Sequence, residues 1–279
     1  MRFIKYHSLG NDYIVVAPGE FGAEPPAERI ALICHRNYGV GSDGILLGPL
    51  SVEDADFGVR IFNPDGSEAE KSGNGLRIFS RYLFDLGLVA CDPFTVSTPG
   101  GVVRCQVLNN GTSVAVEMGT VSFDSALIPV QGPRREAIDE RMSIGGEELT
   151  YCAATIGNPH CVIVRDTVSA HEAKALGPLI ESDPRFPNRT NVQFLSVIDR
   201  GNIEIEIWER GAGYTLASGS SSCAAAAVAH KLGLCDPQVT VHMPGGCIDI
   251  VISDDFSILM TGPVTRVCDG TISEEVFAD

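Results

Sequence analysis

Two serines immediately precede expected helix N-termini, which commonly bind small anions. Ser72 and Ser218 each follow a strand-like segment and a polar, glycine-rich loop, and each precedes an expected helix. The start of a helix presents free backbone N–H groups and the positive end of the helix dipole, so it attracts anions. Glycines at Gly73, Gly75 and Gly219 allow a ligand to approach the backbone closely. These loops therefore predict a binding site for a carboxylate.

A serine is also a common N-cap, and this simpler role fits either loop taken alone. The binding site is favoured because the arrangement occurs twice, 146 residues apart. If the two halves pack around a pseudo-two-fold axis, the helix starts face each other across one cleft. A small carboxylate would then have Ser72 on one side and Ser218 on the other.

The serine loops belong to an internal duplication. The Pro-Gly-Gly turn at 99–101 recurs at 244–246, GNDYIVV at 10–16 recurs as GNPHCVIV at 157–164, and FGVRIFN at 57–63 recurs as IEIEIWE at 203–209. These pairs keep the same order and lie 145–147 residues apart, as expected for a repeated supersecondary unit. We expect an N-terminal lobe at 1–122, a C-terminal lobe at 145–279, and a connecting segment at 123–144 that mixes proline and charge.

Hydrophobic periodicity predicts the elements of each half. Helical spacing favours a long helix over 72–87 and a matching one over 219–232, with shorter helices over 28–37 and 170–180. The alanine run at 224–227 predicts that another backbone element approaches the second long helix closely. Most other segments alternate as strands and are joined by hairpin turns. The fold class is therefore α+β, in which each lobe is a curled, mainly antiparallel sheet around a central helix.

Composition excludes several classes of function. The 279 residues are 44% hydrophobic and carry a net charge of −16, which disfavours nucleic-acid and anionic-membrane partners. No apolar stretch approaches the roughly 20 residues of a membrane span, and no secretory signal is recognisable, so we expect a cytoplasmic protein. The nine cysteines are scattered singly, without a C-x-x-C pair, as reduced thiols would be. No metal-ligand cluster or phosphate-binding fingerprint indicates a metal or cofactor.

Over nearly its whole length the chain resembles the diaminopimelate epimerase family of lysine biosynthesis. The motifs that carry the resemblance are HSLGNDYIVV, GVGSDGILL, FNPDGSEAEKSGNGLR, GNPH, RTNVQF and WERGAGYTLASGSSSCAAA. The resemblance implies a two-lobed fold that clamps an amino acid in the interlobe cleft. It also implies a reaction without pyridoxal phosphate or metal, in which one lobe removes the α-proton and the other returns a proton from the opposite face. It makes a homodimer plausible.

The resemblance also implies roles for individual residues. The backbone N–H groups of Gly73–Asn74 and of Gly219–Ser220 would bind the carboxylate at the reacting carbon, and His160 and Glu209 would lie near the two proton carriers. The polar ends of the substrate would be held by Asn11, Asn63, Asn158, Asn191, Glu209 and Arg210. The same residue types also suit structural roles, because each asparagine could be a turn residue and Glu209 could form a surface ion pair with Arg210.

One departure from the family affects the chemistry directly. The family's two proton carriers are cysteines, and here both positions are serines, Ser72 and Ser218. Forming an alkoxide instead of a thiolate costs roughly 9 kcal/mol more, whereas a helix dipole contributes about 1–2 kcal/mol. Without assistance, the serine pair should not racemise amino acids at a useful rate.

The two serines are compatible with three kinds of protein. The chain could be an epimerase in which both cysteines have been replaced, although further departures at Lys71, Tyr214 and 220–222 count against this. It could be a divergent relative that catalyses another isomerisation or a dehydration of an amino-acid-like substrate, assisted by Lys71, Tyr214, His160 or Glu209. It could also bind an amino acid without catalysis.

Overall fold

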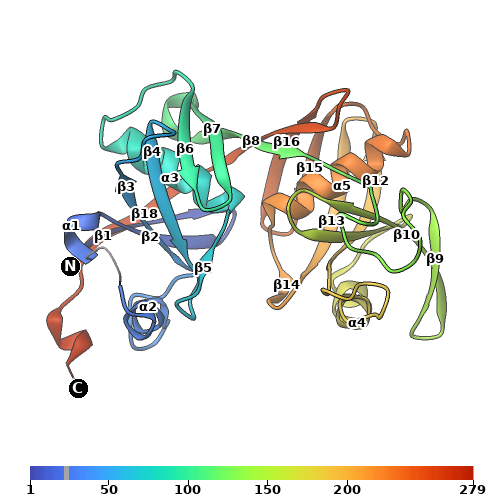
Figure 1. Ribbon diagram of the computed structural model, residues 1–279, viewed down its shortest axis with the longest axis horizontal. Helices are drawn as coiled ribbons and strands as arrows, with labels where there is room; N and C mark the ends of the chain where they lie inside the picture. The colour runs from blue at the N-terminus through green and yellow to red at the C-terminus, as the bar shows by residue number, and fades with distance from the viewer. Residues whose placement is uncertain (22–24, 279) are drawn as a thin grey trace. The chain divides into compact units, whose positions relative to one another are not determined.

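The computed structural model describes residues 1–21 and 25–278. The chain divides into two compact units, Met1–Glu117 with Thr261–Asp279 in the first and Met118–Met260 in the second. Each unit is built from curled sheet strands and one long helix, α3 in the first unit and α5 in the second (Figure 1). This is the α+β architecture predicted from the sequence. No described helix combines the length and the apolar content that a bilayer span requires.

The first unit begins with the N-terminal repeat and ends with a strand from the far end of the chain. Its elements are β1 (Arg2–Ser8), β2 (Asn11–Val16), α1 (Pro18–Phe21), α2 (Ala27–Cys34), β3 (Ile45–Leu50), β4 (Phe57–Phe62), β5 (Glu68–Ala69), α3 (Gly73–Asp85), β6 (Phe94–Thr98), β7 (Gly101–Leu108), η1 (Asn109–Gly111), β8 (Ser113–Thr120), β18 (Thr265–Thr271) and η2 (Glu274–Phe277).

The second unit contains the C-terminal repeat, preceded by one extra strand. Its elements are β9 (Glu140–Ile144), β10 (Glu147–Thr155), β11 (Pro159–Val164), α4 (Ala170–Glu181), β12 (Asn191–Asp199), β13 (Asn202–Glu209), β14 (Gly213–Thr215), α5 (Gly219–Lys231), β15 (Gln238–Met243), β16 (Gly246–Ile252) and β17 (Ser257–Pro263).

The strand pairing of the first repeat recurs in the second. In the first repeat β1–β2 and β3–β4 are antiparallel, whereas β2–β3 and β4–β6 are parallel. In the second, β10–β11 and β12–β13 are antiparallel, whereas β11–β12 and β13–β15 are parallel. Each repeat then continues into an antiparallel hairpin, β6–β7 or β15–β16. The predicted duplication and the mainly antiparallel sheets are therefore confirmed.

The two long helices form where the sequence places them. α3 begins at Gly73 and buries Leu76, Phe79 and Leu83 completely. α5 begins at Gly219, and every residue from Ser221 to Ala229 is buried. Its small alanine side chains allow the strands β10–β13, β15 and β16 to pack against it. The sheet of the second unit therefore encloses α5 almost completely, and most residues of α3 are buried as well.

The helix α2 ends at Cys34, three residues before the end of the predicted helix at 28–37. The chain turns to extended backbone at His35. The ring nitrogen Nδ1 of His35 accepts hydrogen bonds from the backbone N–H groups of Asn37 and Tyr38. These side-chain bonds replace the helical ones and end the helix.

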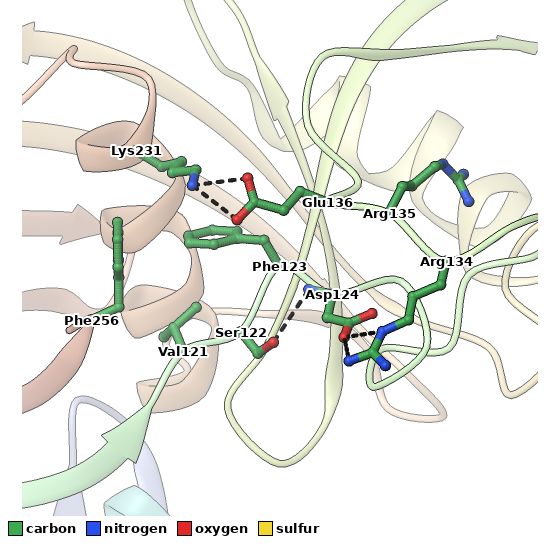
Figure 2. A pocket seen from close by; sticks show the side chains of 9 residues that line it. All are labelled: Val121, Ser122, Phe123, Asp124, Arg134, Arg135, Glu136, Lys231 and Phe256. Carbon is green, nitrogen blue, oxygen red and sulfur yellow. Dashed lines mark hydrogen bonds and ion pairs between the residues drawn. The ribbon is translucent and has the colours of Figure 1, made fainter.

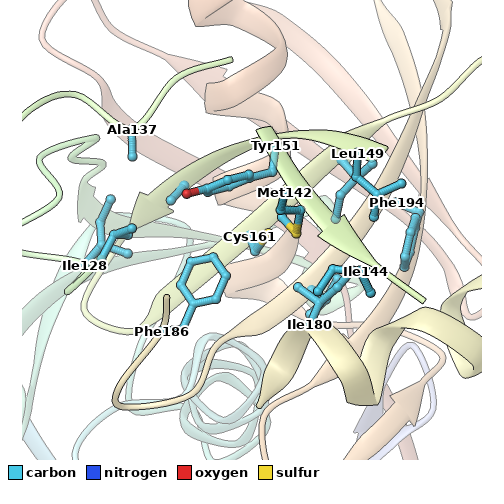
Figure 3. Packing of buried hydrophobic residues seen from close by; sticks show 14 of the residues in the cluster. Ile128, Ala137, Met142, Ile144, Leu149, Tyr151, Cys161, Ile180, Phe186 and Phe194 are labelled. Carbon is cyan, nitrogen blue, oxygen red and sulfur yellow. The ribbon is translucent and has the colours of Figure 1, made fainter. Parts of the chain in front are cut away.

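The domain boundaries differ from the prediction at both ends of the second repeat. The segment 123–144 is not a plain connector, because Ile128, Ala137, Met142 and Ile144 are part of the second unit's hydrophobic core (Figure 3). Residues 261–279 do not belong to the C-terminal lobe, because β18 pairs with β1 in the first unit. In both repeats the first strand thus pairs with a strand from outside the repeat, β18 with β1 and β9 with β10.

Candidate active site

The helix start at Ser72 has the geometry of an N-cap. Ser72 has extended backbone angles, φ −141° and ψ 119°, and its Oγ accepts a hydrogen bond of 3.0 Å from the backbone N–H of Gly75. The hydroxyl of Tyr13 lies 3.3 Å from the same oxygen. Ser72 and Gly73 are half-buried, so the first turn of α3 remains partly accessible to a ligand.

The helix start at Ser218 repeats the backbone but not the cap. Its backbone angles are φ −147° and ψ 123°, nearly those of Ser72, and its carbonyl accepts the first helical bond from Ser222 N–H at 3.0 Å. Within the described part of the chain, its side chain caps no backbone N–H of α5. Ser218 is also more buried, at 4% exposure. The two hydroxyls therefore meet different surroundings on the same scaffold.

The repeated Pro-Gly-Gly turns fix the two serine loops. The N–H of Gly100 donates to the carbonyl of Glu70 at 2.8 Å, and the N–H of Gly245 donates to the carbonyl of Leu216 at 2.8 Å. Each acceptor lies two residues before a serine. A Cβ at Gly100 would lie 2.9 Å from the Glu70 carbonyl oxygen, so only glycine fits this contact without a shift. The turns that reveal the duplication in the sequence thus also position its helix starts.

An asparagine side chain reaches the first turn of the long helix in each unit. In the first unit, Asn74 Nδ2 donates to Asn11 Oδ1 at 3.0 Å. In the second unit, Asn158 Nδ2 donates to Ser220 Oγ at 3.3 Å. Asn11 and Asn158 occupy equivalent positions of the repeat, as do Asn74 and Ser220. The structure therefore brings Asn11 and Asn74 together at the start of α3, and Asn158 and Ser220 together at the start of α5.

His160 lies behind Asn158. The ring is fully buried, its Nε2 is 3.0 Å from Asn158 Oδ1, and its Nδ1 is 3.1 Å from Gln193 Nε2. Burial lowers the pKa of His160 to about 3, so the ring is neutral near pH 7. Because the Gln193 amide donates to Nδ1, the proton is on Nε2 and points at Asn158. His160 is thus placed to orient Asn158, and neither ring nitrogen is available to a substrate.

Asn191 and Arg210 form one structural connection. Asn191 is buried; its Nδ2 donates to the Pro159 carbonyl at 2.9 Å, and its Oδ1 accepts from the backbone N–H of Arg210 at 2.9 Å. The Arg210 side chain is exposed and donates to the Asn188 carbonyl at 3.1 Å. Asn191 therefore ties the end of β13 to the start of β11, while the Arg210 guanidinium remains accessible.

Three further sequence candidates have other surroundings. Asn63 is half-buried in a turn, where its Nδ2 donates to Ser67 Oγ at 3.0 Å. Glu209 is half-buried at the end of β13. Tyr214 donates to Glu206 at 2.7 Å and packs against the core near α4, with Lys174 over its ring. Tyr214 thus lies on the α4 side of the sheet, away from the start of α5.

Sequence reasoning missed the polar groups that support the two asparagines. Asp43 accepts a 3.0 Å hydrogen bond from Asn11 Nδ2, and Asp12 is bound by Arg36. Burial alone would raise the pKa of Asp12, but its hydrogen bonds to Arg36 and Lys5 outweigh this and lower that pKa to about 2. In the second unit His160 supports Asn158, and it is held in turn by the neutral side chain of Gln193, which donates to Ser221 Oγ at 3.0 Å. The sequence signals that could have identified two of these groups are the motif GSDG for Asp43 and the motif TNVQF for Gln193.

A cavity of the second unit lies away from the candidate site. It measures about 400 Å³ and lies beside Lys231, the last residue of α5, at the opposite end of the helix from Ser218 (Figure 2). Two of its cations are neutralised, since Lys231 pairs with Glu136 at 2.9 Å and Arg134 with Asp124 at 2.6 Å. The candidate site is therefore defined by the helix starts and not by this cavity.

Comparison with known proteins assigns this scaffold. The family model for diaminopimelate epimerase matches residues 3–123 and 152–267. A Nostoc sp. protein named diaminopimelate epimerase 2 is 60% identical over 278 residues, which cover 100% of this chain and 98% of the relative. The chain belongs to the diaminopimelate epimerase family. A family member from Desulfitobacterium hafniense is 37% identical over 286 residues, with 100% of each chain covered.

Solved structures extend the likeness of the diaminopimelate epimerase fold beyond this family. A PhzF-family phenazine biosynthesis protein from Bacillus anthracis matches 98% of this chain and 99% of its own, with a TM-score of 0.70 at 16% identity. A hydroxyproline epimerase from Agrobacterium vitis matches 97% of this chain and 91% of its own, with a TM-score of 0.68 at 15% identity. At these identities the likeness concerns the fold alone.

Proposed function

We propose that this chain is a cofactor-independent isomerase that inverts the α-carbon of an amino acid of the diaminopimelate type. The single observation that supports this most strongly is the repetition of one device in both units. Each unit presents the start of a long helix, a serine immediately before it, and an asparagine side chain bonded to its first turn. Relatives that cover the whole chain carry the name diaminopimelate epimerase.

The chemistry of inversion explains why two such devices are useful. Removing an α-proton moves negative charge onto the adjacent carboxylate, and helix N–H groups aimed at that carboxylate stabilise the charge. We assign this role to the N–H groups of Gly73–Asn74 and Gly219–Ser220. Inversion also needs two groups on opposite faces of one carbon. The proposal assigns Ser72 to one face and Ser218 to the other.

The distal part of the substrate requires separate recognition. We assign its carboxylate to the exposed guanidinium of Arg210, which suits bidentate binding, and an ammonium group of the substrate to Glu209. Asn191 holds the backbone of Arg210 and acts as a positioning residue, as His160 does for Asn158. The turn position of Asn63 gives it the weakest support among the assigned residues.

The serines favour a second candidate function, which is binding without turnover. An alkoxide costs roughly 9 kcal/mol more than a thiolate at neutral pH. The Ser72 oxygen already accepts a hydrogen bond from the Gly75 N–H, and Tyr13 lies within hydrogen-bond distance of it. The same carboxylate and ammonium contacts would serve an amino-acid-binding protein equally well.

One experiment separates the two functions. The chain is incubated with L,L-diaminopimelate in deuterated water, and NMR follows loss of the α-proton signal and appearance of the meso isomer. Exchange with inversion supports the isomerase, whereas binding detected by calorimetry without exchange supports the second candidate. The control is the Ser72→Ala, Ser218→Ala variant, which removes both hydroxyls. The Ser72→Cys, Ser218→Cys variant tests the scaffold, because it should epimerise if only the proton carriers limit the rate.

We also propose a cytoplasmic location and a homodimer. All nine cysteines are free, as expected for a reducing compartment, and the homodimer rests on the family resemblance. Cell fractionation and light scattering on the purified chain test these two proposals. A monomer at micromolar concentration would overturn the homodimer.

A further inference from the structure

A cysteine and a histidine face each other on the hairpin formed by β15 and β16, outside the candidate active site. Cys247 and His242 are directly paired residues of these antiparallel strands. Cys247 is exposed, and its Sγ lies 3.3 Å from His242 Nδ1. Both side chains lie on the solvent face of the hairpin, since their neighbours Val241 and Ile248 are buried. A nucleophile and a base thus meet at the surface.

The hydrogen bonds behind His242 fix the direction of proton movement. Asn202 Nδ2 lies 2.9 and 3.1 Å from the two carboxylate oxygens of Asp199, which can only accept. The Asn202 amide must therefore turn its oxygen toward His242, whose Nε2 is 2.9 Å away and donates to it. With the ring proton on Nε2, Nδ1 presents its lone pair to the thiol of Cys247. The thiol is therefore the donor of this hydrogen bond.

Asp199 ends the chain of hydrogen bonds that runs from Cys247 through His242 and Asn202, and it carries a negative charge. Hydrogen bonds from Asn202 and from the Gly201 N–H lower the pKa of Asp199, with a contribution from nearby His242. The carboxylate is ionised at neutral pH and holds the Asn202 amide, which in turn accepts the hydrogen bond from His242 Nε2. Glu204, the register partner of His242 on β13, adds a carboxylate beside it, and Asp249 is held by Thr240 on the same face. Negative charge thus lies near the ring that receives the thiol proton.

We propose that Cys247 is an activated thiol and a modification site for low-molecular-weight disulfides. His242 Nδ1 takes the thiol proton, and the Cys247 sulfur attacks one sulfur of the disulfide. A new sulfur–sulfur bond forms as the original one breaks. The leaving thiolate takes the proton from His242 and departs as a thiol. Cys247 is oxidised to a mixed disulfide, and the other half of the reagent is reduced, so the step needs no further reactant.

The chain contains its own controls for this proposal. Cys91 and Cys268 are also exposed, and in the residues that the structure describes neither is hydrogen-bonded to a histidine. The other six cysteines are buried, and burial raises the pKa of Cys152 to about 11 and that of Cys235 to about 11. Exposure alone should therefore give Cys91, Cys247 and Cys268 similar reactivity, and the histidine should separate Cys247 from the others.

The test is competitive alkylation of the native full-length chain with iodoacetamide at pH 7, read cysteine by cysteine by peptide mass spectrometry. An unassisted thiol is only a few per cent thiolate at this pH, so Cys247 should react about tenfold faster than Cys91 and Cys268. His242→Gln should reduce the rate at Cys247 to that of the other two. Oxidised glutathione should then add to Cys247 first in the unmodified protein.

The same measurement reports whether the variant keeps its fold. In a folded variant the alkylation rates of Cys91 and Cys268 should not change, and the buried Cys152 should remain unreactive. If His242→Gln exposes Cys152, Asn202→Leu tests the proposal instead, since it removes the acceptor for Nε2 and should slow Cys247. Equal rates at the three exposed cysteines of the unmodified protein would overturn the proposal. An unchanged Cys247 rate in a correctly folded His242→Gln variant would overturn it as well.

Discussion

Acidification should weaken the second unit through His160. Burial lowers the pKa of this ring from an ordinary value of 6.5 to about 3. In the unfolded chain the same ring binds a proton near pH 6.5. Below that pH the unfolded state therefore binds more protons than the folded state, so the free energy of unfolding decreases as the pH falls.

The size of the effect follows from the two pKa values. From about pH 6.5 to pH 4.5, one proton is linked to unfolding over two pH units, at about 1.36 kcal/mol each. The contribution of His160 to the free energy of unfolding should therefore be about 2–3 kcal/mol lower at pH 4.5 than at pH 7. In His160→Gln this contribution is absent, because glutamine does not titrate.

Urea denaturation followed by tryptophan fluorescence measures this contribution. The single tryptophan, Trp208, lies in the second unit and packs against its core, so it reports the unit that contains His160. The wild type should lose about 2–3 kcal/mol more than His160→Gln between pH 7 and pH 4.5. The other five histidines are common to both proteins and cancel in the difference. Parallel losses in the two proteins would refute the neutral, buried state of His160.

Three further predictions concern the helix starts and the distal site. Ser72→Ala removes an N-cap and should lower the free energy of unfolding by about 1 kcal/mol in calorimetry. Ser218→Ala removes no cap and should lower it by less, so equal losses would contradict the geometry of the two helix starts. Gly100→Ala places a Cβ 2.9 Å from the Glu70 carbonyl oxygen and should destabilise the first unit by about 1–3 kcal/mol in the same assay. Arg210→Ala should weaken diaminopimelate binding about tenfold in titration calorimetry, while the unfolding free energy changes by less than about 0.5 kcal/mol; unchanged affinity would remove Arg210 from the site.

The sequence predicts those parts of the fold that depend on local chemistry or on repetition. The long helices follow from apolar spacing and from the serines that precede them. α5 begins at Gly219, as predicted, and α3 begins at Gly73, one residue after the predicted start. The duplication follows from the Pro-Gly-Gly turns, whose glycine N–H groups hold the serine loops. Because each of these contacts requires a glycine at a fixed position relative to the serine, the Pro-Gly-Gly turns can be recognised in the sequence.

The parts that the sequence did not predict depend on long-range pairing and on burial. Nothing in the tail sequence indicates that β18 pairs with β1, some 260 residues earlier in the chain. The segment 123–144 looks like a linker because its core residues, such as Ile128 and Met142, are interspersed with charges. His160 was expected near the proton carriers because of the family resemblance carried by its GNPH motif, but its complete burial behind Asn158 is a property of the folded sheet.

The two asparagines of the repeat are supported in electrostatically opposite ways. Asn11 is held by Asp43, beside the charged cluster of Asp12 with Arg36. Hydrogen bonds lower the pKa of Asp12 to about 2 despite its burial, so the stability that Asp12 contributes is complete above about pH 4 and is lost only as the pH falls toward 2. Asn158, in contrast, is held by the neutral ring of His160, whose contribution begins to fall below about pH 6.5.

Between pH 6.5 and pH 4.5, only the second of these supports should weaken. Hydrogen exchange read by mass spectrometry can separate them, once the rates are corrected for the intrinsic pH dependence of exchange. Protection should fall in the first turn of α5 and at the start of β11, while the first turn of α3 and the start of β2 keep theirs. His160→Gln should abolish this difference between the units. If protection instead falls first around Asn11, the charged cluster is the weaker support and the assignment of His160 as the acid-sensitive group is wrong.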